Sequence, residues 1–228
     1  MRTLVVDIGG SGIKALVLDS SGRPLTVRSR IKTPSPPMPA AVLKVVQRLA
    51  AKNATFDRVS VGFPGVVRNG VTETAPNLAK QWAGFALAEK LESKLAKPVR
   101  IANDADVQGF GAISRRGVEL MITLGTGFGS ALFVDGKLVP NLEVAHHPFL
   151  RGKTYEDLLG NAARKKVGNK KWNRRLGQAI EALRNLFNYD YLYLGGGNAK
   201  RVTLKLPQNV RLVSNLAGLL GGIALWEE

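Results

Sequence analysis

Cysteine is absent from the 228 residues of this chain. Its absence excludes disulfide bonds and zinc sites with cysteine ligands, so we expect no zinc. Long apolar runs are absent too: no stretch of about 18 apolar residues occurs, so we expect no transmembrane helix. The apolar run Leu4–Val6 is short and is followed by Asp7, so we expect no secretory signal. Together these absences predict a cytoplasmic protein without a membrane partner.

Acidic residues are few: 17 Asp and Glu stand against 33 Lys and Arg, a formal net charge of +16. Such an excess points to a polyanionic partner such as nucleic acid, an anionic membrane surface or inorganic polyphosphate. It is equally compatible with a soluble protein whose charge serves no particular ligand, because net charge governs association and not fold. An apolar fraction of 45% with 22% charged residues is typical of a globular protein.

Apolar runs that end at glycine or proline turns predict strands, and apolar residues at helical spacing predict helices. Strands are expected at residues 2–8, 13–18, 25–31, 58–63, 99–102, 119–124, 130–134, 189–194 and 210–213. Helices are expected at residues 40–51, 87–95, 104–114, 155–186 (with an interruption near Gly168) and 215–226. The order of elements repeats, which predicts an α/β fold with similar N-terminal (1–104) and C-terminal (105–228) domains. A C-terminal helix near 215–228 is expected to pack back on the first domain.

The first glycine-rich turn is Asp7-Ile8-Gly9-Gly10-Ser11-Gly12-Ile13-Lys14, which lies between two expected strands. Glycine lacks a Cβ atom, so backbone N–H groups in such a turn can approach phosphate oxygens closely. Asp7 could hold Mg²⁺ through water, and Lys14 could add positive charge. The alternative is a simple hairpin in which the glycines serve only the turn.

Two further glycine-rich turns follow expected strands. Leu124-Gly125-Thr126-Gly127-Phe128-Gly129-Ser130 resembles a dinucleotide-binding pattern, but a strand follows it where that pattern requires a helix. A second phosphate-binding hairpin is therefore favoured, with a structural hairpin as the alternative. The run Gly195-Gly196-Gly197 would let a flat ring or a backbone approach closely, or it serves as a flexible turn.

Two side-chain groups could serve catalysis or binding. Asp104 could accept the proton of an attacking hydroxyl group, and Asn103 could bind a neighbouring sugar hydroxyl, or both residues cap the helix. Glu143 and His146 could bind sugar hydroxyls. A metal site at His146 and His147 is disfavoured, because adjacent histidines cannot both face one ion comfortably, and a surface or structural role is the alternative.

Residues 151–175 concentrate Lys and Arg around Trp172. Such a segment could bind nucleic acid through phosphate contacts and base stacking, or it could guide an inorganic polyanion. A solvated helical face is the third interpretation.

In this order the motifs resemble the ROK family of sugar kinases, within the actin–hexokinase–Hsp70 superfamily, and especially its polyphosphate glucokinase branch. The matching segments are DIGGSGIK (7–14), GFPGVV (62–67), NDAD (103–106), ITLGTGFGSALFVDGKLVPN (122–141), EVAH (143–146) and LFNYDYLYLGGGNAK (186–200). The resemblance implies an actin-like ATPase (ribonuclease H-like) fold, two α/β halves around a central cleft. It implies a homodimeric enzyme that makes glucose 6-phosphate from glucose or a related hexose, using polyphosphate, ATP or both with Mg²⁺.

The resemblance also implies roles for individual residues. Asp104 is expected to be the catalytic base. The sugar is expected to contact Gly65, Asn103, Asp104, Glu143, His146 and Glu156. Phosphates are expected at Asp7, Gly9, Gly10, Ser11, Gly12, Lys14, Thr126, Gly127, Gly196 and Gly197, with Asp7 also organising Mg²⁺. Basic residues expected to guide polyphosphate are Lys165, Lys166, Lys170, Lys171 and Arg174.

Three features depart from the family pattern. The cysteine-rich zinc motif of most members is missing, as it is in the polyphosphate branch. Ala145 stands where glycine is expected, which could shift His146, and Asn198 replaces an aliphatic residue. The alternatives are an ATP-dependent kinase for another hexose, such as mannose or an amino sugar, and a non-catalytic sugar- or nucleic-acid-binding regulator. Repressors of the family carry a helix-turn-helix ahead of the kinase fold, and Asp7 leaves no room for one, so we expect no nucleic acid partner.

Overall fold

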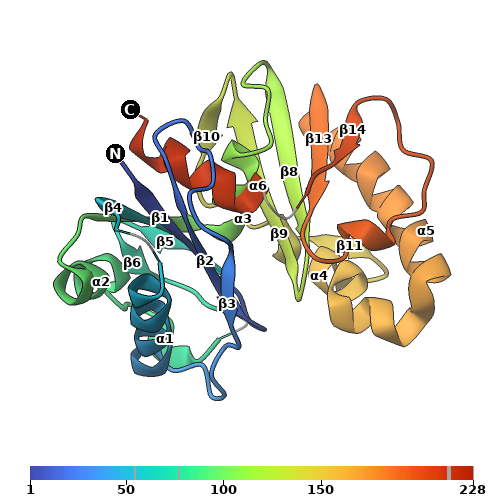
Figure 1. The fold of residues 1–228 in the computed structure, drawn as a ribbon. Helices are drawn as coiled ribbons and strands as arrows, with labels where there is room; N and C mark the ends of the chain where they lie inside the picture. The colour runs from blue at the N-terminus through green and yellow to red at the C-terminus, as the bar shows by residue number, and fades with distance from the viewer. Residues whose placement is uncertain (54, 77, 215–216, 228) are drawn as a thin grey trace. The chain divides into compact units, whose positions relative to one another are not determined.

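The computed structural model describes residues 1–53, 55–76, 78–214 and 217–227 of the chain. Two compact units are present: Met1–Gly111 with Leu216–Glu228, and Ala112–Asn215 (Figure 1). The division after Gly111, instead of after residue 104, follows from α3 (Asp104–Phe110), which packs on strands β4 (Arg58–Phe63) and β7 (Val99–Asn103) of the first unit.

The first unit is built on a five-stranded sheet in the order β3-β2-β1-β4-β7. β1 pairs antiparallel with β2, which pairs antiparallel with β3, whereas β1, β4 and β7 run parallel. A short hairpin of β5 and β6, which the sequence pattern did not predict, follows β4. The strands are β1 (Thr3–Ile8), β2 (Ile13–Leu18), β3 (Ser29–Ile31), β4 (Arg58–Phe63), β5 (Val67–Arg68), β6 (Val71–Thr72) and β7 (Val99–Asn103).

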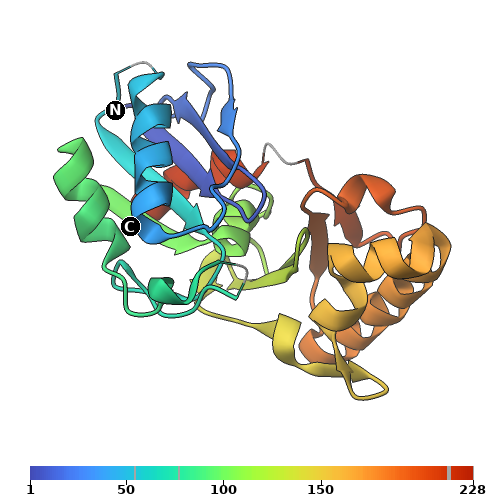
Figure 2. The same cartoon turned by 90° about the horizontal axis from the view of Figure 1, so that it is seen from below.

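Both faces of this sheet are covered, because alternate residues of its strands are apolar on each face. Leu4, Val6 and Ile8 of β1 pack in the core with α1 (Pro39–Ala51), α2 (Leu87–Leu95) and the short helix η1 (Lys80–Trp82). Val5 packs on the opposite face against the C-terminal segment α6 (Ala217–Leu220) and η4 (Gly221–Trp226), on the face that also carries α3 (Figure 2). The two faces therefore differ: the α3 face carries the chain's C-terminal segment.

Trp226 fixes the C-terminal segment to this sheet. The guanidinium groups of Arg58 and Arg100 both contact its ring, with their Cζ atoms 4.8 and 4.7 Å from the ring centroid. Its indole N–H donates to Oγ of Ser60 at 2.8 Å, and Ser60 in turn donates to the carbonyl of Gly222 at 2.6 Å. These contacts join residues that are far apart in the sequence.

The expected helix at 215–226 is observed as the α-helical turn α6 followed by the 3₁₀ helix η4; residues 215 and 216 lie outside the described residues. Gly221 and Gly222 let this segment approach closely. A Cβ atom at Gly221 would collide with the carbonyl of Val107, and one at Gly222 would press on the side chain of Val5.

The second unit contains a five-stranded sheet in the order β10-β9-β8-β13-β14. β8, β9 and β10 pair antiparallel, and β13 runs parallel to both β8 and β14. This is the topology of the first sheet, so the predicted repeat of element order is present in the structure. The strands are β8 (Val118–Leu124), β9 (Phe128–Val134), β10 (Lys137–Val139), β13 (Tyr191–Gly195) and β14 (Val210–Leu212).

Helices α4 (Tyr155–Leu159) and α5 (Asn161–Phe187) pack with this sheet around a core that contains Trp172, Leu176 and Leu183. Gly168 interrupts α5 with a φ of 75°, near the interruption that the sequence predicts. The remaining elements are the hairpin of β11 (Pro148–Leu150) and β12 (Lys153–Thr154) and the 3₁₀ helices η2 (Val144–His146) and η3 (Ala199–Arg201).

Two expected elements are shorter than the pattern suggests. The strand expected at 25–31 is only Ser29–Ile31, because the side chain of Thr26 accepts the N–H of Val17 at 2.9 Å and takes the place of a backbone partner. The helix expected at 104–114 ends at Phe110. In the part of the chain that the structure describes, no helix combines the length and apolarity that a membrane span requires.

Candidate active site

The turn between β1 and β2 is built from glycines. The N–H of Gly9 donates to the carbonyl of Gly12 at 3.2 Å, which closes the turn, and Gly10 and Ser11 are exposed at its tip. Gly12 is buried, and a Cβ atom there would lie 2.5 Å from Nε of Arg30. The structure thus brings the four expected phosphate-binding residues of this turn together, with Arg30 beside them.

Three charged residues form a row across the strands next to this turn. Asp7 of β1 is paired with Lys14 of β2, and Lys14 is paired with Arg30 of β3. Directly paired residues point to the same face of a sheet, so the three side chains share one face. Nζ of Lys14 lies 2.6 Å from Oδ2 of Asp7. The charges of Lys14 and Asp7 therefore offset each other beside the turn.

Asp7, which the resemblance predicts to organise Mg²⁺, lies next to the first glycine turn. Mg²⁺ is usually bound by one or two carboxylates together with water and substrate phosphates. One oxygen of Asp7 contacts Lys14, and the side chain is 27% exposed. Among the described residues, no group of three or more His, Cys, Asp or Glu could bind a metal by itself. The single carboxylate of Asp7 fits a magnesium ion that phosphates of the donor also bind.

Asp104 lies at the same end and on the same face of the sheet as Asp7. Gly62 of β4 pairs with Asp7 and Ala102, so a Cβ atom at Gly62 would point to that face. This position is 3.5 Å from Cα and 3.7 Å from Cβ of Asp104, the first residue of α3. The fold therefore brings together two acidic residues from separate strand ends, with only a glycine between them in the sheet.

Asn103 caps α3, as the capping alternative predicts. Its Oδ1 accepts the N–H of Ala105 at 2.7 Å, and its Nδ2 donates to the carbonyl of Gly65 at 3.1 Å. Gly65 must be small, because a Cβ atom there would collide with the carbonyl of Thr74. Asn103 and Gly65 are thus held next to Asp104, and their contact with a sugar stays a prediction.

In the second unit, the turn between β8 and β9 is held against the junction of α4 and α5. The N–H of Gly125 donates to the carbonyl of Gly127 at 3.1 Å, and the N–H of Asn161 donates to the carbonyl of Thr126 at 3.2 Å. The N–H of Phe128 donates to Oε2 of Glu156 at 3.3 Å. Glu156, an expected sugar-binding residue, therefore contacts the chain next to the expected phosphate-binding residues Thr126 and Gly127.

Asn198 connects this turn with the glycine run after β13. Its N–H donates to the carbonyl of Leu124 at 2.8 Å, and its Nδ2 donates to the carbonyl of Gly125 at 3.1 Å. Gly196 has a φ of 82° and lies so close to Leu124 that a Cβ atom would be 2.6 Å from its carbonyl oxygen. The departure at position 198 therefore has a physical role: a buried amide joins two glycine turns.

Glu143, His146 and Glu156 form a cluster within the second unit. Nε2 of His146 lies 3.9 Å from Oε2 of Glu143. Burial raises the pKa of Glu143, the charge of Glu156 raises it further, and His146 acts in the opposite direction. The structure brings these three predicted sugar-binding residues together in the second unit. A partly buried pair of carboxylates is suited to accept hydrogen bonds from hydroxyl groups.

The two neighbours of His146 differ in burial. Ala145, which stands where the family has glycine, is 3% exposed and packs in the core of the unit. His147 is exposed, and its ring centroid is 6.3 Å from that of Tyr155. The extra methyl group of Ala145 is thus accommodated by packing next to His146.

Exposed basic side chains lie along the first half of α5, on both sides of its kink at Gly168. Trp172, which the sequence places among them as a possible stacking partner for bases, is fully buried, and its indole N–H donates to the carbonyl of Leu159 at 2.8 Å. The prediction that Trp172 could stack on nucleic acid bases is therefore wrong. The exposed residues are Lys165, Lys166, Lys170, Lys171 and Arg174.

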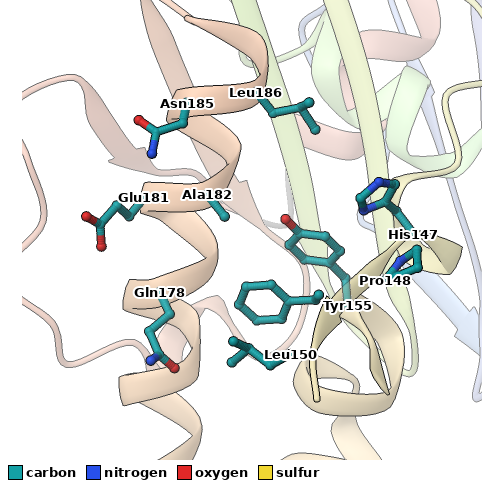
Figure 3. Close-up of a pocket in the computed structure, with 10 residues that line it drawn as sticks. His147, Pro148, Leu150, Tyr155, Gln178, Glu181, Ala182, Asn185 and Leu186 are labelled. Atoms are coloured by element: carbon teal, nitrogen blue, oxygen red, sulfur yellow. The ribbon is translucent and has the colours of Figure 1, made fainter. Parts of the chain in front are cut away.

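A cavity of about 490 Å³ lies elsewhere in the second unit, between the β11–β12 hairpin and α5. His147 and Tyr155 line one side, and Ala182 and Leu186 of α5 line the other (Figure 3). None of the predicted sugar- or phosphate-binding residues is among those that line it. Its lining includes His147 and Tyr155, which adjoin the predicted residues His146 and Glu156 in the sequence.

Arg30 and Asn198 are the site residues that the sequence reasoning missed. Arg30 could have been found from the expected strand pairing, since a strand that pairs with the one containing Lys14 must place some side chain beside the turn. Asn198 was noticed only as a departure, because its partner Gly125 is distant in the sequence.

Comparisons with known proteins show which family the chain is similar to. The model of the ROK family matches residues 3–143. The chain is 30% identical over 233 residues to the polyphosphate glucokinase of Mycobacterium tuberculosis (strain ATCC 25618 / H37Rv), covering 95% of this chain and 88% of the relative. The crystal structure of the inorganic polyphosphate/ATP-glucomannokinase from Arthrobacter sp. strain KM matches with a TM-score of 0.90 and 31% identity over 99% of each chain. A ROK family glucokinase from Streptomyces griseus, in complex with glucose and AMPPNP, shares the fold, with a TM-score of 0.83 and 20% identity over 99% of each chain.

Proposed function

The chain belongs to the ROK family, and from this membership we propose that it phosphorylates the 6-hydroxyl group of glucose with inorganic polyphosphate or ATP as the donor. Its fold is the actin-like ATPase fold of the ROK sugar kinases. Relatives at 30% and 31% identity that bear the names polyphosphate glucokinase and polyphosphate/ATP-glucomannokinase support this reaction. The observation that carries the proposal is the position of Asp104, at the same end and on the same face of the sheet as Asp7.

Asp104 acts as the base in the proposed reaction. The sugar hydroxyl oxygen forms a bond to the terminal phosphorus of the donor, and the bond from that phosphorus to its bridging oxygen breaks. The hydroxyl proton passes to the carboxylate of Asp104, and the shortened donor leaves with the electron pair. Phosphoryl transfer depends mainly on positioning and on stabilising charge, so the surrounding residues serve these two tasks.

The sugar-binding residues act through hydrogen bonds. Glu143, His146 and Glu156 take the hydroxyl groups of the hexose, and Asn103 and Gly65 lie next to the base. A buried carboxylate without a partner is costly, and the burial that raises the pKa of Glu143 therefore favours a bound hydroxyl donor there. Equatorial and axial hydroxyls are distinguished by which of these acceptors they reach, so this cluster sets the choice between glucose and a related hexose.

The donor-binding residues are the glycine turns. Backbone N–H groups at Gly9, Gly10, Ser11 and Gly12 take phosphate oxygens, with Lys14 adding charge next to them. The second unit contributes Thr126, Gly127, Gly196 and Gly197. Mg²⁺, when bound at Asp7, supplies positive charge to the donor phosphates. Water exclusion would prevent hydrolysis of the donor.

The exposed basic residues of α5 guide polyphosphate. Their side chains carry like charges on one element, and a polyanion that neutralises them releases its counterions. Their number accounts for part of the net charge of +16. Burial of Trp172 removes the aromatic platform that a single-stranded nucleic acid would use, which favours an inorganic chain.

We further propose that the protein works in the cytoplasm as a homodimer and does not bind nucleic acid. The homodimer is inferred from the family resemblance. The cytoplasmic location is inferred from the sequence and from substrates that are cytoplasmic metabolites.

The test is formation of glucose 6-phosphate from glucose and Mg²⁺ with either long-chain polyphosphate or ATP. Asp104→Asn keeps the shape of the side chain and removes the base, so the rate is expected to fall about 10²–10⁴-fold. Glu89→Gln, which removes an exposed acid of α2, is the matched control and is expected to keep the wild-type rate.

Each outcome of this assay has a meaning. Product from polyphosphate supports the full proposal. Product from ATP alone, or from mannose or an amino sugar alone, keeps the kinase and changes its donor or its hexose. Full activity of Asp104→Asn would rule out Asp104 as the base.

A further inference from the structure

Arg30 lies directly against the first glycine turn. It is the central residue of the short edge strand β3 and is paired with Lys14 of β2. Nη2 of Arg30 donates to the carbonyl of Ser11 at 3.1 Å. A Cβ atom at Gly12 would lie 2.5 Å from Nε and 2.8 Å from Cζ of Arg30. The guanidinium group therefore occupies the space that the missing side chain of Gly12 leaves open.

The two basic side chains at this turn, Lys14 and Arg30, contact different groups. Lys14 is bonded to the carboxylate of Asp7 at 2.6 Å, so its charge is offset within the protein. The bond of Arg30 to Ser11 is to a neutral carbonyl, which leaves the positive charge of the guanidinium uncompensated by that contact. A guanidinium group has five N–H donors, so further donors are available for a second acceptor.

We propose that Arg30 binds the phosphoryl chain of the donor at the first glycine turn; this inference rests on the proposed function. The planar fork of a guanidinium group matches the geometry of phosphate oxygens and can bind two of them at once. The exposed tip of the turn, Gly10 and Ser11, lies beside the group. ATP and polyphosphate share this chemistry, a chain of anionic phosphates, and the proposal concerns that shared part.

The packing against Gly12 gives the arginine an orientation. Arginine in solution loses side-chain entropy when it binds, and a guanidinium already held by Ser11 and Gly12 loses less. Lysine at this position would keep the charge but would lose the planar contact and the paired donors. Arg30 is therefore a donor-binding residue whose geometry, as well as its charge, is set by the turn.

The experiment uses the full chain and compares wild type with Arg30→Ala, Arg30→Lys and Arg28→Ala. Arg28 is exposed and lies two positions earlier, about 7 Å along the chain, so its replacement removes the same charge without touching the turn. Initial rates are measured with ATP and with polyphosphate, each varied at saturating glucose, and with glucose varied at saturating donor. Binding of inorganic tripolyphosphate is titrated by calorimetry at several salt concentrations.

Arg30→Ala is expected to raise the donor KM about tenfold, the size of one charge-assisted hydrogen bond at an exposed site. The KM for glucose and the thermal midpoint are expected to stay at wild-type values, and Arg30→Lys is expected to recover part of the loss. The slope of log affinity for tripolyphosphate against log salt is expected to become shallower by about one. Arg28→Ala is expected to match wild type in all of these measurements.

The inference is overturned if Arg30→Ala leaves the donor KM unchanged, if Arg28→Ala changes it equally, or if the loss is confined to kcat with a lower thermal midpoint. A raised KM for one donor only supports the inference and assigns Arg30 to that donor's chain. If the wild-type protein forms no product with either donor, the proposed function fails, and the tripolyphosphate titration alone then decides the role of Arg30.

Discussion

Replacing Asn198 by alanine is expected to loosen two glycine turns of the second unit together. The side-chain amide of Asn198 donates to the carbonyl of Gly125 at 3.1 Å, and the residue is 8% exposed. A net hydrogen bond is worth about 1 kcal/mol, whereas a buried acceptor left without a partner costs about 1–3 kcal/mol. Gly125 is partly exposed and can recover some of this from water. We therefore expect the free energy of unfolding to fall by about 1–2 kcal/mol.

The same substitution is expected to affect the donor more than the sugar. The turn of Gly125 carries Thr126 and Gly127, whereas Glu143 and His146 lie in a separate segment after β10. The donor KM should rise several-fold and the KM for glucose should change little. Urea unfolding followed by circular dichroism measures the stability, and initial rates measure the two KM values.

Asn185→Ala provides the control, because Asn185 is an exposed residue of α5 and not part of either turn. Hydrogen exchange adds a local measurement: the N–H of Asn198, bonded to the carbonyl of Leu124 at 2.8 Å, should lose protection in Asn198→Ala. A variant with wild-type stability and unchanged exchange at this amide would refute the reasoning, since the turns would then be held without the side chain.

Two further predictions concern Glu119 and α5. Glu119 is fully buried, and although burial raises its pKa, hydrogen bonds from Ser114, Tyr193 and Arg116 outweigh burial and lower it below 4.5. A carboxylate whose pKa is lower in the folded than in the unfolded state stabilises the fold above its unfolded pKa, and this stabilisation is lost as the pH falls through its folded pKa. The free energy of unfolding should therefore depend less steeply on pH below about 4.5 in Glu119→Gln than in wild type. An equal pH dependence of the two proteins would contradict this. On α5, five exposed basic residues are replaced together by alanine: Lys165, Lys166, Lys170, Lys171 and Arg174. This variant should bind polyphosphate more weakly and with a smaller salt dependence, while its KM for ATP stays unchanged. An equal rise in the KM for polyphosphate and for ATP would exclude a path used by polyphosphate alone.

Short sequence patterns were sufficient to predict most of the helices and strands. β1 and β2 follow from apolar runs on both sides of a glycine turn, and α1 follows from its helical spacing. The strand expected at 25–31 was too long because alternation cannot reveal that the hydroxyl of Thr26 bonds to the N–H of Val17. The β5–β6 hairpin was missed because each of its strands has only two residues, too few for a period to be read.

The site was harder to predict from the sequence than the fold. Asp7 and Asp104 could each be placed at the end of a strand, but their common face depends on β4 lying between β1 and β7 with Gly62 in register. Trp172 was misjudged because its basic neighbours suggest an exposed face, whereas the residue itself is fully buried. Arg30 depends on a tertiary contact with Gly12 that no local pattern encodes.

The repeated topology also explains why only one unit is expected to hold a metal. The turns after β1 and β8 are equivalent in the two sheets, and each is followed by an antiparallel strand. Two positions before the first turn stands Asp7, paired with Lys14; two positions before the second stands Thr123, paired with Gly129 and accepting its N–H at 3.1 Å. A hydroxyl group bonded in this way offers no negative charge to a cation. The second turn therefore has no acidic side chain at the position equivalent to Asp7, so a metal is expected only at the first turn.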